Sequence, residues 1–208
     1  MKPIIVGMTG ASGAAYGIRL VEVLLESGRR VDLVVSDPAR LVIREELGRV
    51  ISHPLQTESW KPFFKTECLK LLQCHNVRDF SAPIASGSYP VEAMVVLPCS
   101  MGTLGAIAAG ISQNLIHRAA DCVLKEGRNL ILVPRETPLH VIHLENMLKL
   151  AKAGVRMVPA MPGFYSGASS ISEMVDFLVG KVMDQLSLPH SLYPRWTGSL
   201  LKERERAI

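Results

Sequence analysis

The sequence predicts an α/β fold built on a doubly wound parallel sheet. Short runs rich in Val, Ile and Leu alternate with segments of helical periodicity, which is the pattern of successive strand–helix–strand units. The length of 208 residues suits one domain. Hydrophobic residues make up 48% of the chain but aromatic residues only 5%. The excess is therefore mainly aliphatic, as expected for parallel strands buried on both faces.

The first predicted strand is Ile4–Met8, and apolar runs predict five more strands at residues 29–36, 70–74, 92–100, 129–136 and 155–160. The first helix carries Ile18, Val21, Leu24 and Leu25 at helical spacing, and Gly28 ends it. Further helices are expected at residues 38–47, from Leu104 with Thr103 as its N-cap, and at 114–125, 139–153 and 172–186. Together these elements predict a Rossmann- or flavodoxin-like three-layer sandwich.

Two parts of the chain give weaker patterns. Residues 48–92 are ambiguous, apart from an exposed loop expected at residues 85–90 and the possible strand at 70–74. Near the C-terminus, Pro189 and Pro194 disfavour a packed helix. We expect one domain over residues 1–190, followed by an arm over residues 191–208.

Composition excludes several classes of function. The net charge is +4, but the basic residues are scattered and form no stripe with interleaved aromatics, so no nucleic-acid partner is expected. The sequence has no uninterrupted run of 18 apolar residues, so no membrane segment is expected. The N-terminal apolar run stops at Gly7 and is too short for the hydrophobic region of a signal peptide. The four cysteines lack a CxxC spacing, which fits reduced thiols in the cytoplasm.

The stretch GMTGASGAAYG, from Gly7 to Gly17, joins the first strand to the first helix. Gly10, Ala11, Ser12 and Gly13 are small enough for a ligand to approach the backbone N–H groups. The helix start adds partial positive charge, which suits an anion. A tight turn without a ligand is the alternative interpretation.

Small, polar or charged residues follow five of the predicted strands. They are Thr9, Gly10, Ala11 and Ser12 after the first strand, Ser36 after the second, and residues 98–103, 134–138 and 162–165 after later ones. Because ligands of open α/β sheets bind beyond the carboxyl ends of the strands, these residues predict a site at that edge.

The first ligand to consider is a dinucleotide, but its glycine fingerprint fails because Ser12 stands where the second glycine belongs. The second strand ends in Ser36 rather than in the acidic residue that reads a ribose. A serine hydroxyl suits a phosphate or a ribityl oxygen, which favours a mononucleotide such as FMN. Ser36 is an equally good N-cap for the helix that Pro38 opens.

Charged residues supply further candidates. Arg118 and Lys125 share one helical face with Asn114 and Asp121, which is either a binding face or an ordinary solvated one. Glu136 follows Arg135 at a proline-flanked strand end, where a carboxylate can carry protons or form a salt bridge.

Other residue types with reactive side chains show no such pattern. Cys99 is expected to be a small buried residue rather than a nucleophile, since no base is placed beside it. His117, His140 and His143 show no metal-ligand spacing and are expected to be surface or core residues. We therefore expect no metal site.

Several motifs in combination resemble the UbiX/Pad flavin prenyltransferases. They are MTGASGAAYG, SGS, LPCSMGTLGAIAAG, NLIHRAAD, VLKE, VPRETPLHVIHLENMLKLAKAG, VPAMPGFY and PRW, which run from Lys2 to about Trp196. The resemblance implies an enzyme that joins a dimethylallyl group from dimethylallyl monophosphate to N5 and C6 of reduced FMN, without a metal. The product, prenylated FMN, would serve a UbiD-type decarboxylase.

The resemblance also assigns residues. Positions that contact the flavin are Gly10, Ala11, Ser12, Ser36, Ser100, Met101, Gly102, Thr103 and Arg135. Positions around the prenyl phosphate are Ser86, Gly87, Arg118, Lys125, Arg135, Glu136, Tyr165 and Lys181, with Trp196 as an aromatic wall. Ser12, Lys125 and Glu136 would be catalytic. Lys181 stands where many members have arginine, so the charge is kept but the planar fork is lost.

Three points stay open at the level of the sequence. The donor is either the monophosphate or the diphosphate. Trp196 either lines the site or pins the tail to the core. The family implies a dodecamer with sites shared between subunits, and the high apolar fraction is compatible with that assembly.

Two other functions compete with prenyl transfer. One is an FMN-dependent decarboxylase of the phosphopantothenoylcysteine type, but its Pro-x-Met-Asn loop is missing and His53 lacks the surrounding pattern. The other is a noncatalytic flavin carrier, which would have no need of Glu136, Tyr165 or Lys181.

Overall fold

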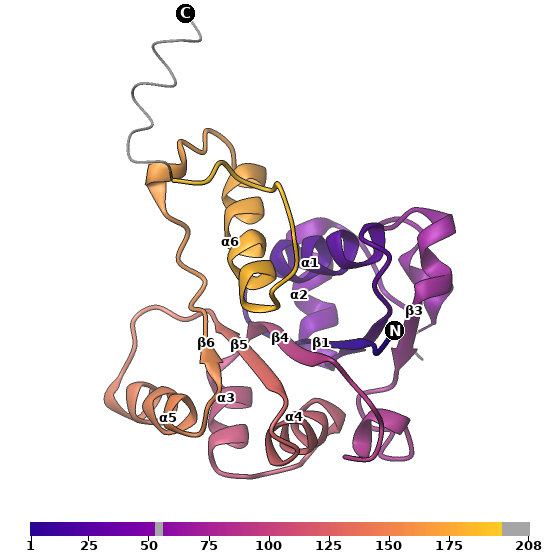
Figure 1. Ribbon diagram of the computed structural model, residues 1–208, viewed down its shortest axis with the longest axis vertical. Coiled ribbons are helices and arrows are strands. Elements are labelled where there is room, and N and C mark those ends of the chain that lie inside the picture. The colour runs from indigo at the N-terminus through magenta and orange to yellow at the C-terminus, as the bar shows by residue number, and fades with distance from the viewer. Residues whose placement is uncertain (53–55, 197–208) are drawn as a thin grey trace, which may run out of the picture. The chain divides into compact units, whose positions relative to one another are not determined.

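The computed structural model describes residues 1–52 and 56–196, and its centre is a six-stranded parallel sheet (Figure 1). The strand order is β3-β2-β1-β4-β5-β6, which confirms the doubly wound prediction. The strands are β1 Ile4–Met8, β2 Val31–Val35, β3 Leu72–His75, β4 Ala93–Cys99, β5 Asn129–Pro134 and β6 Arg156–Met157.

The helices cover both faces of this sheet. They are α1 Ala14–Glu26, α2 Asp37–Leu47, α3 Met101–Ala108, α4 Leu115–Lys125 and α5 Val141–Lys152. In Figure 1, α1 and α2 lie on one side of the sheet and α3, α4 and α5 on the other. The chain builds outward from β1 to β3, returns to place β4 beside β1, and builds outward again. Right-handed crossovers then place the two sets of helices on opposite faces.

The chain divides into two compact units. Met1–Ala160 contains the sheet and helices α1 to α5, and the second unit begins at Met161 and contains α6, Ile171–Gln185. The expected domain over residues 1–190 with an arm from residue 191 stays a prediction. Residues 189–196 have no helix or strand, and the rest of the expected arm, like His53, lies outside the described residues.

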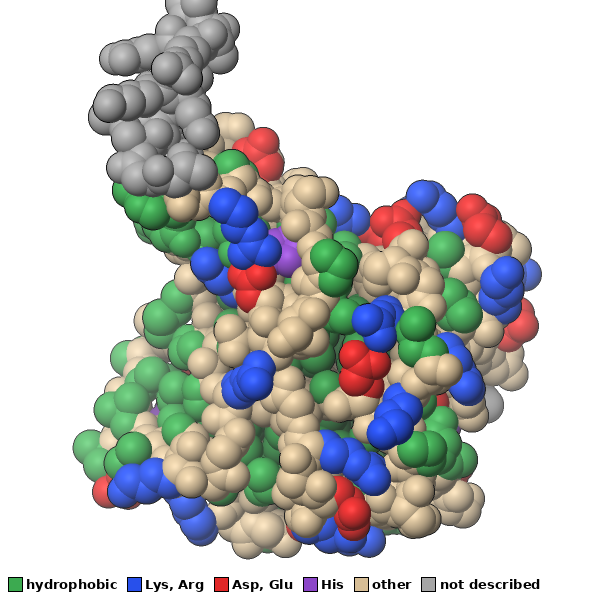
Figure 2. Space-filling view, in the orientation of Figure 1, with side chains coloured by type: hydrophobic (Ala, Val, Ile, Leu, Met, Phe, Trp, Pro, Cys, Tyr) green, Lys and Arg blue, Asp and Glu red, His purple; other side chains and the backbone are tan. Residues whose placement is uncertain are grey.

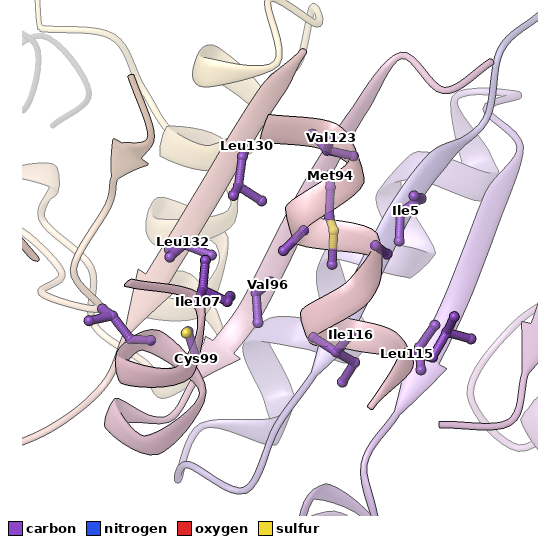
Figure 3. Close-up of a cluster of buried hydrophobic side chains, with 14 of the residues drawn as sticks. Ile5, Met94, Val96, Cys99, Ile107, Leu115, Ile116, Val123, Leu130 and Leu132 are labelled. Carbon is purple, nitrogen blue, oxygen red and sulfur yellow. The ribbon is translucent and has the colours of Figure 1, made fainter. Parts of the chain in front are cut away.

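The core on the α3–α4 side is aliphatic (Figure 3). Every residue of β4 is buried, and Met94 and Val96 meet Ile116 and Val123 of α4 in one cluster. On β1, a Cβ atom at Gly7 would come within 3.1 Å of Ile116, so the glycine lets α4 pack close to the sheet. This packing fixes the strand ends that carry the candidate site.

Two predicted boundaries differ from the structure. Helix α3 begins at Met101, and Ser100 rather than Thr103 is its N-cap, because the Ser100 hydroxyl accepts a hydrogen bond from the Thr103 N–H. The sixth strand is two residues long, although the N–H groups of Val158 and Ala160 still donate to carbonyls of β5.

The ambiguous residues 48–92 form short elements around β3. Three 3-10 helices occur in the described part, at Thr57–Trp60, Thr66–Leu71 and Pro83–Ala85. Trp60 is fully buried and stacks on Phe64, with 5.6 Å between ring centroids. An aromatic cluster therefore packs this segment.

Among the described residues, no helix is long and apolar enough to cross a membrane.

Candidate active site

The carboxyl ends of β1 and β4 lie side by side where the strand order reverses. The buried Thr9 hydroxyl connects them, since it donates to the Pro98 carbonyl at 2.8 Å and accepts from the Ser100 N–H at 2.7 Å. Helices α1 and α3 follow β1 and β4 on opposite faces of the sheet, and α/β sheets bind their ligands at this kind of position.

The loop after β1 forms one wall of this edge. A Cβ atom at Gly10 would collide with Pro38 at the start of α2, so only glycine lets the two segments lie so close. Gly13 has a φ of 105°, a left-handed conformation that also favours glycine. Between them, Ala11 is buried and Ser12 is exposed, so the Ser12 hydroxyl is accessible to a ligand.

Ser36 and Ser100 are both helix N-caps. The Ser36 hydroxyl accepts from the Ala39 N–H at 3.2 Å, which confirms the capping interpretation. Ser100 caps α3 in the same way and donates to the Thr103 hydroxyl at 3.2 Å. Since a hydroxyl oxygen has two lone pairs and one proton, capping leaves Ser36 able to contact a ligand as well.

The start of α3 leaves open space beside these caps. Met101 is buried, whereas Gly102 is exposed and no atom lies within 4 Å of the position a Cβ would take there. The N–H groups of the first turn have no partner within the helix. A planar ring with hydrogen-bond acceptors fits this geometry.

Arg135 and Glu136 follow β5 at the same edge. The Arg135 N–H donates to the Cys99 carbonyl at 3.2 Å, so its loop is tied to the end of β4. Glu136 is exposed, and its carboxylate accepts from the Thr137 N–H at 3.0 Å. The expected proton carrier thus folds back onto its own loop in this structure.

The structure also brings in Glu46, which sequence reasoning missed. Its carboxylate accepts from the Gly13 N–H at 3.0 and 3.1 Å and from the Ala14 N–H at 2.8 Å. The start of α1, expected to hold a ligand's anion, is therefore occupied by the protein's own carboxylate. No signal in the sequence links Glu46 to a turn 33 residues earlier.

The pKa of Tyr16, in the first turn of α1, depends on burial and on the charges of Arg135 and Glu46. Burial raises the pKa of its hydroxyl above the usual value, the positive charge of Arg135 opposes that change, and the Glu46 carboxylate adds to it. Arg135, after β5, and Glu46, at the end of α2, therefore both lie near enough to Tyr16 of α1 to influence its hydroxyl.

A second cluster joins α4 and the nearby Arg128 to residues 85–89. Arg118 donates to the Ala85 carbonyl at 3.0 Å and pairs with Asp121, while Arg128 donates to the carbonyls of Gly87 and Tyr89 at 2.8 Å each. Within this loop, Ser86 and Ser88 are exposed, as predicted, whereas Gly87 is buried.

Lys125 belongs to the same cluster. A Cβ atom at Gly87 would collide with the side chains of Lys125 and Glu126, which pair with each other. The structure therefore brings together Ser86, Gly87, Arg118 and Lys125, four of the residues expected around the prenyl phosphate.

These residues and the flavin loops occupy different edges of the sheet. Helix α4 follows α3 and leads back to the start of β5, and Lys125 precedes the first residue of β5 by four positions. The loop around Gly87 precedes β4, whose first residue pairs with the first residue of β5. Lys125 and Gly87 thus lie at the amino edge of the sheet, whereas Ser12 and Ser100 lie at its carboxyl edge.

The second unit gathers Tyr165, Lys181 and Trp196. The Lys181 ammonium lies 5.3 Å from the Phe177 ring centroid and 5.0 Å from that of Tyr193. Tyr165 meets Phe177 and Trp196 edge to face, at 5.5 and 6.1 Å between centroids. These three predicted residues are close together within their own unit.

The charge of Lys181 is maintained in this aromatic surround. Partial burial acts against the charged form, but hydrogen bonds and attraction to Tyr193 and Tyr165 outweigh it, so the pKa of the ammonium is raised. The second unit therefore presents a cation framed by aromatic rings.

The reactive side chains elsewhere are accounted for. Cys99 is fully buried, and burial raises the pKa of its thiol to about 12, so it stays protonated and is no nucleophile, as predicted. His117 is buried, and His140 caps α5 through its Nδ1 atom. The described residues contain no group of three or more His, Cys, Asp or Glu arranged to hold a metal.

Comparisons with known proteins identify the family. A family model described as Flavoprotein matches residues 1–183. Flavin prenyltransferase UbiX of Halalkalibacterium halodurans is 50% identical over 195 residues, which span 92% of this chain and 91% of that protein. The chain belongs to the UbiX flavin prenyltransferase family. UbiX of Pseudomonas aeruginosa is 44% identical over 93% of both chains.

Solved structures extend this similarity. A crystal structure of AnUbiX (PadA1) in complex with FMN and dimethylallyl pyrophosphate has a TM-score of 0.83 and 40% identity, covering 95% of this chain and 98% of that one. A dodecameric FMN-dependent UbiX-like decarboxylase from Escherichia coli O157:H7 has a TM-score of 0.82 and 44% identity, covering 95% and 100%. Cysteine decarboxylases such as EpiD share 16% identity at a TM-score of 0.56, which shows the fold alone.

The hydroxyl of Thr9 offers a direct test of this site. In Thr9→Val the Ser100 N–H and the Pro98 carbonyl lose that partner, so we expect the free energy of unfolding to fall by about 1–3 kcal/mol. FMN affinity should fall as well, because the Thr9 hydroxyl fixes Ser100, the N-cap of α3 and a predicted flavin contact. Thr9→Ser keeps the hydroxyl and should retain both properties. Urea denaturation and flavin fluorescence titration measure them, and an unchanged FMN affinity in Thr9→Val would contradict the role of the bridge.

Proposed function

We propose that this protein transfers a dimethylallyl group from dimethylallyl monophosphate to N5 and C6 of reduced FMN. The product, prenylated FMN, then serves a UbiD-type decarboxylase in the cytoplasm. The observation that carries the proposal is the near-complete match to UbiX flavin prenyltransferases, with the small and hydroxyl-bearing residues of its motifs at the carboxyl edge of the sheet.

The flavin fits the loops around the reversal of strand order. The residues proposed to hold it are Gly10, Ala11, Ser12, Ser36, Ser100, Met101, Gly102, Thr103 and Arg135. The open surface at Gly102 accommodates a planar ring, and the first turn of α3 supplies donors for its acceptor atoms. When bound, reduced FMN supplies the nucleophilic atoms of the reaction.

The prenyl donor needs cations, because its C–O bond breaks as phosphate leaves. We assign Ser86, Gly87, Arg118, Lys125 and Arg135 to its phosphate, with Tyr165, Lys181 and Trp196 around the donor. Lysine and arginine stabilise the leaving dianion, and an aromatic face stabilises the allylic cation. Glu136 and Ser12 handle protons at the reacting ring, and the bond from the Thr137 N–H uses only one oxygen of the Glu136 carboxylate.

The separation of the two clusters favours a site completed by a second copy. Lys125 lies at the amino edge of the sheet and Ser12 at the carboxyl edge. The α5 residues Val141, Ile142, Leu144 and Leu148 are more than half exposed and form an apolar patch visible at the lower left of Figure 2. Exposed apolar patches commonly mark protein interfaces. We propose that the protein forms a homo-oligomer, and that this oligomer is a dodecamer like the one described for a relative.

The first experiment is anaerobic incubation with reduced FMN and either dimethylallyl monophosphate or the pyrophosphate. Mass spectrometry of the released flavin should show a gain of one dimethylallyl unit, and comparison of the two donors identifies the one used. Unmodified FMN with both donors would contradict prenyl transfer and favour an FMN-dependent decarboxylase or a flavin carrier.

Glu136→Gln tests the proposed proton transfer. The amide keeps the size of the side chain and its capacity to accept a hydrogen bond but loses its basicity. We expect unchanged FMN binding and a loss of product formation by about 10²-fold or more. Glu67→Gln, at an exposed carboxylate of the 3-10 helix Thr66–Leu71, is a matched control with an expected normal rate. Normal turnover by folded Glu136→Gln would remove it from the mechanism.

Subunit mixing tests the shared site. Ser12→Ala and Lys125→Ala should each be nearly inactive alone, since each removes one half of every site. In co-expressed mixed oligomers, random pairing restores about a quarter of the sites if the two residues come from different copies. Doubly tagged, tandem-purified oligomers allow this measurement. No recovery in mixed oligomers would place both residues in a site within one chain.

A further inference from the structure

The carboxylate of Asp184 holds the segment that follows α6. Arg195 donates to both of its oxygens, at 2.7 and 2.8 Å, and the Tyr193 hydroxyl donates at 2.8 Å. His190 Nε2 lies 3.1 Å from the same carboxylate. Asp184 stands in the last turn of α6, so one helical side chain collects three partners from residues 189–196.

This contact is stronger than an ordinary surface ion pair. Hydrogen bonds from Arg195, and then from Tyr193 and His190, hold the pKa of Asp184 well below its usual range, despite partial burial. A bidentate guanidinium–carboxylate pair fixes the orientation of the two side chains as well as the distance between them. Asp184 therefore favours its charged form, which is the form that Arg195 binds.

Little apolar burial holds the end of this segment. Pro194, Arg195 and Trp196 are exposed. Tyr193 is buried, and Gly180 of α6 makes room for it, because a Cβ atom there would collide with the rings of Tyr193 and His190. The segment is thus attached through the rings of Tyr193 and His190 at Gly180 and through the Asp184 network.

The network continues to the aromatic surround of Lys181. Tyr193 donates to Asp184 through its hydroxyl and presents its ring to the Lys181 ammonium. Trp196 directly follows Arg195 and meets Tyr165 edge to face. The Asp184 network thus holds the residue next to Trp196 and one of the rings around Lys181.

We propose that Asp184 and Arg195 are positioning residues for the prenyl donor. They hold Trp196 and the Tyr193 ring so that the aromatic frame around Lys181 exists before the donor binds. The inference rests on the proposed function, because it takes Lys181, Tyr165 and Trp196 to be donor-binding residues. Neither Asp184 nor Arg195 is expected to touch the donor.

The test combines proteolysis with kinetics. Trypsin cleaves after Arg195, and the pair should protect that bond. In Asp184→Asn we expect cleavage after Arg195 to accelerate about tenfold and the donor KM to rise about tenfold, a change of about 1.4 kcal/mol in binding. The FMN dissociation constant should stay within about twofold of the original, because no flavin-binding residue is altered.

Two further variants sharpen the result. Arg195→Lys keeps the charge but loses the fork, so its donor KM should lie between those of the unmodified protein and Asp184→Asn. It alters an exposed side chain, so it tests the proposal even if Asp184→Asn misfolds. Glu92→Gln is the matched control, since it makes the same chemical change at a carboxylate that pairs with one arginine, Arg29.

Each outcome is decisive. Faster cleavage with a raised donor KM in Asp184→Asn and an intermediate KM in Arg195→Lys supports positioning. Faster cleavage with an unchanged donor KM would contradict positioning, because the pair would then only attach the segment. Unchanged cleavage would also contradict it, because the pair would then not hold the segment at all. If the unmodified protein makes no prenylated FMN, the proposed function fails, while the trypsin experiment still reports whether the pair holds the segment.

Discussion

The hydroxyl of Thr9 links the two strands on which the candidate site depends. It bonds to the backbone on both sides of Cys99 and thereby fixes the end of β4 against the end of β1. The loop of Gly10 to Gly13 and the start of α3 are placed by those ends. A buried hydroxyl can satisfy a donor and an acceptor at once, which an apolar side chain of the same shape cannot do.

Charged groups around this centre are held by backbone groups, and their placement has functional consequences. Glu46 occupies the start of α1, and Glu136 accepts from its own loop. Lys125 stands at the opposite edge of the sheet because a helix that follows a parallel strand must return to the other edge. Under the proposed function, a single chain with this topology presents two half-sites, which oligomer formation would complete.

Local sequence patterns predicted some features well and others poorly. The aliphatic runs predicted the central strands because buried parallel strands need such residues on both faces. The cap of α3 was misplaced by three residues, since Ser100 and Thr103 are both good caps and only the direction of the chain after β4 chooses between them. Glu46 was missed because its partners are 33 residues away.

By itself, the sequence determined the α/β class, the strand ends that carry small and hydroxyl-bearing residues, and, through its motifs, the family. These properties depend on residue type and short spacing, which are local. Tertiary structure alone decided that Ser12 and Lys125 lie at opposite edges of the sheet, and that Asp184 binds Arg195. Such relations depend on the path of the chain through space, and the distances that fix them are set by long-range packing rather than by neighbours in the sequence.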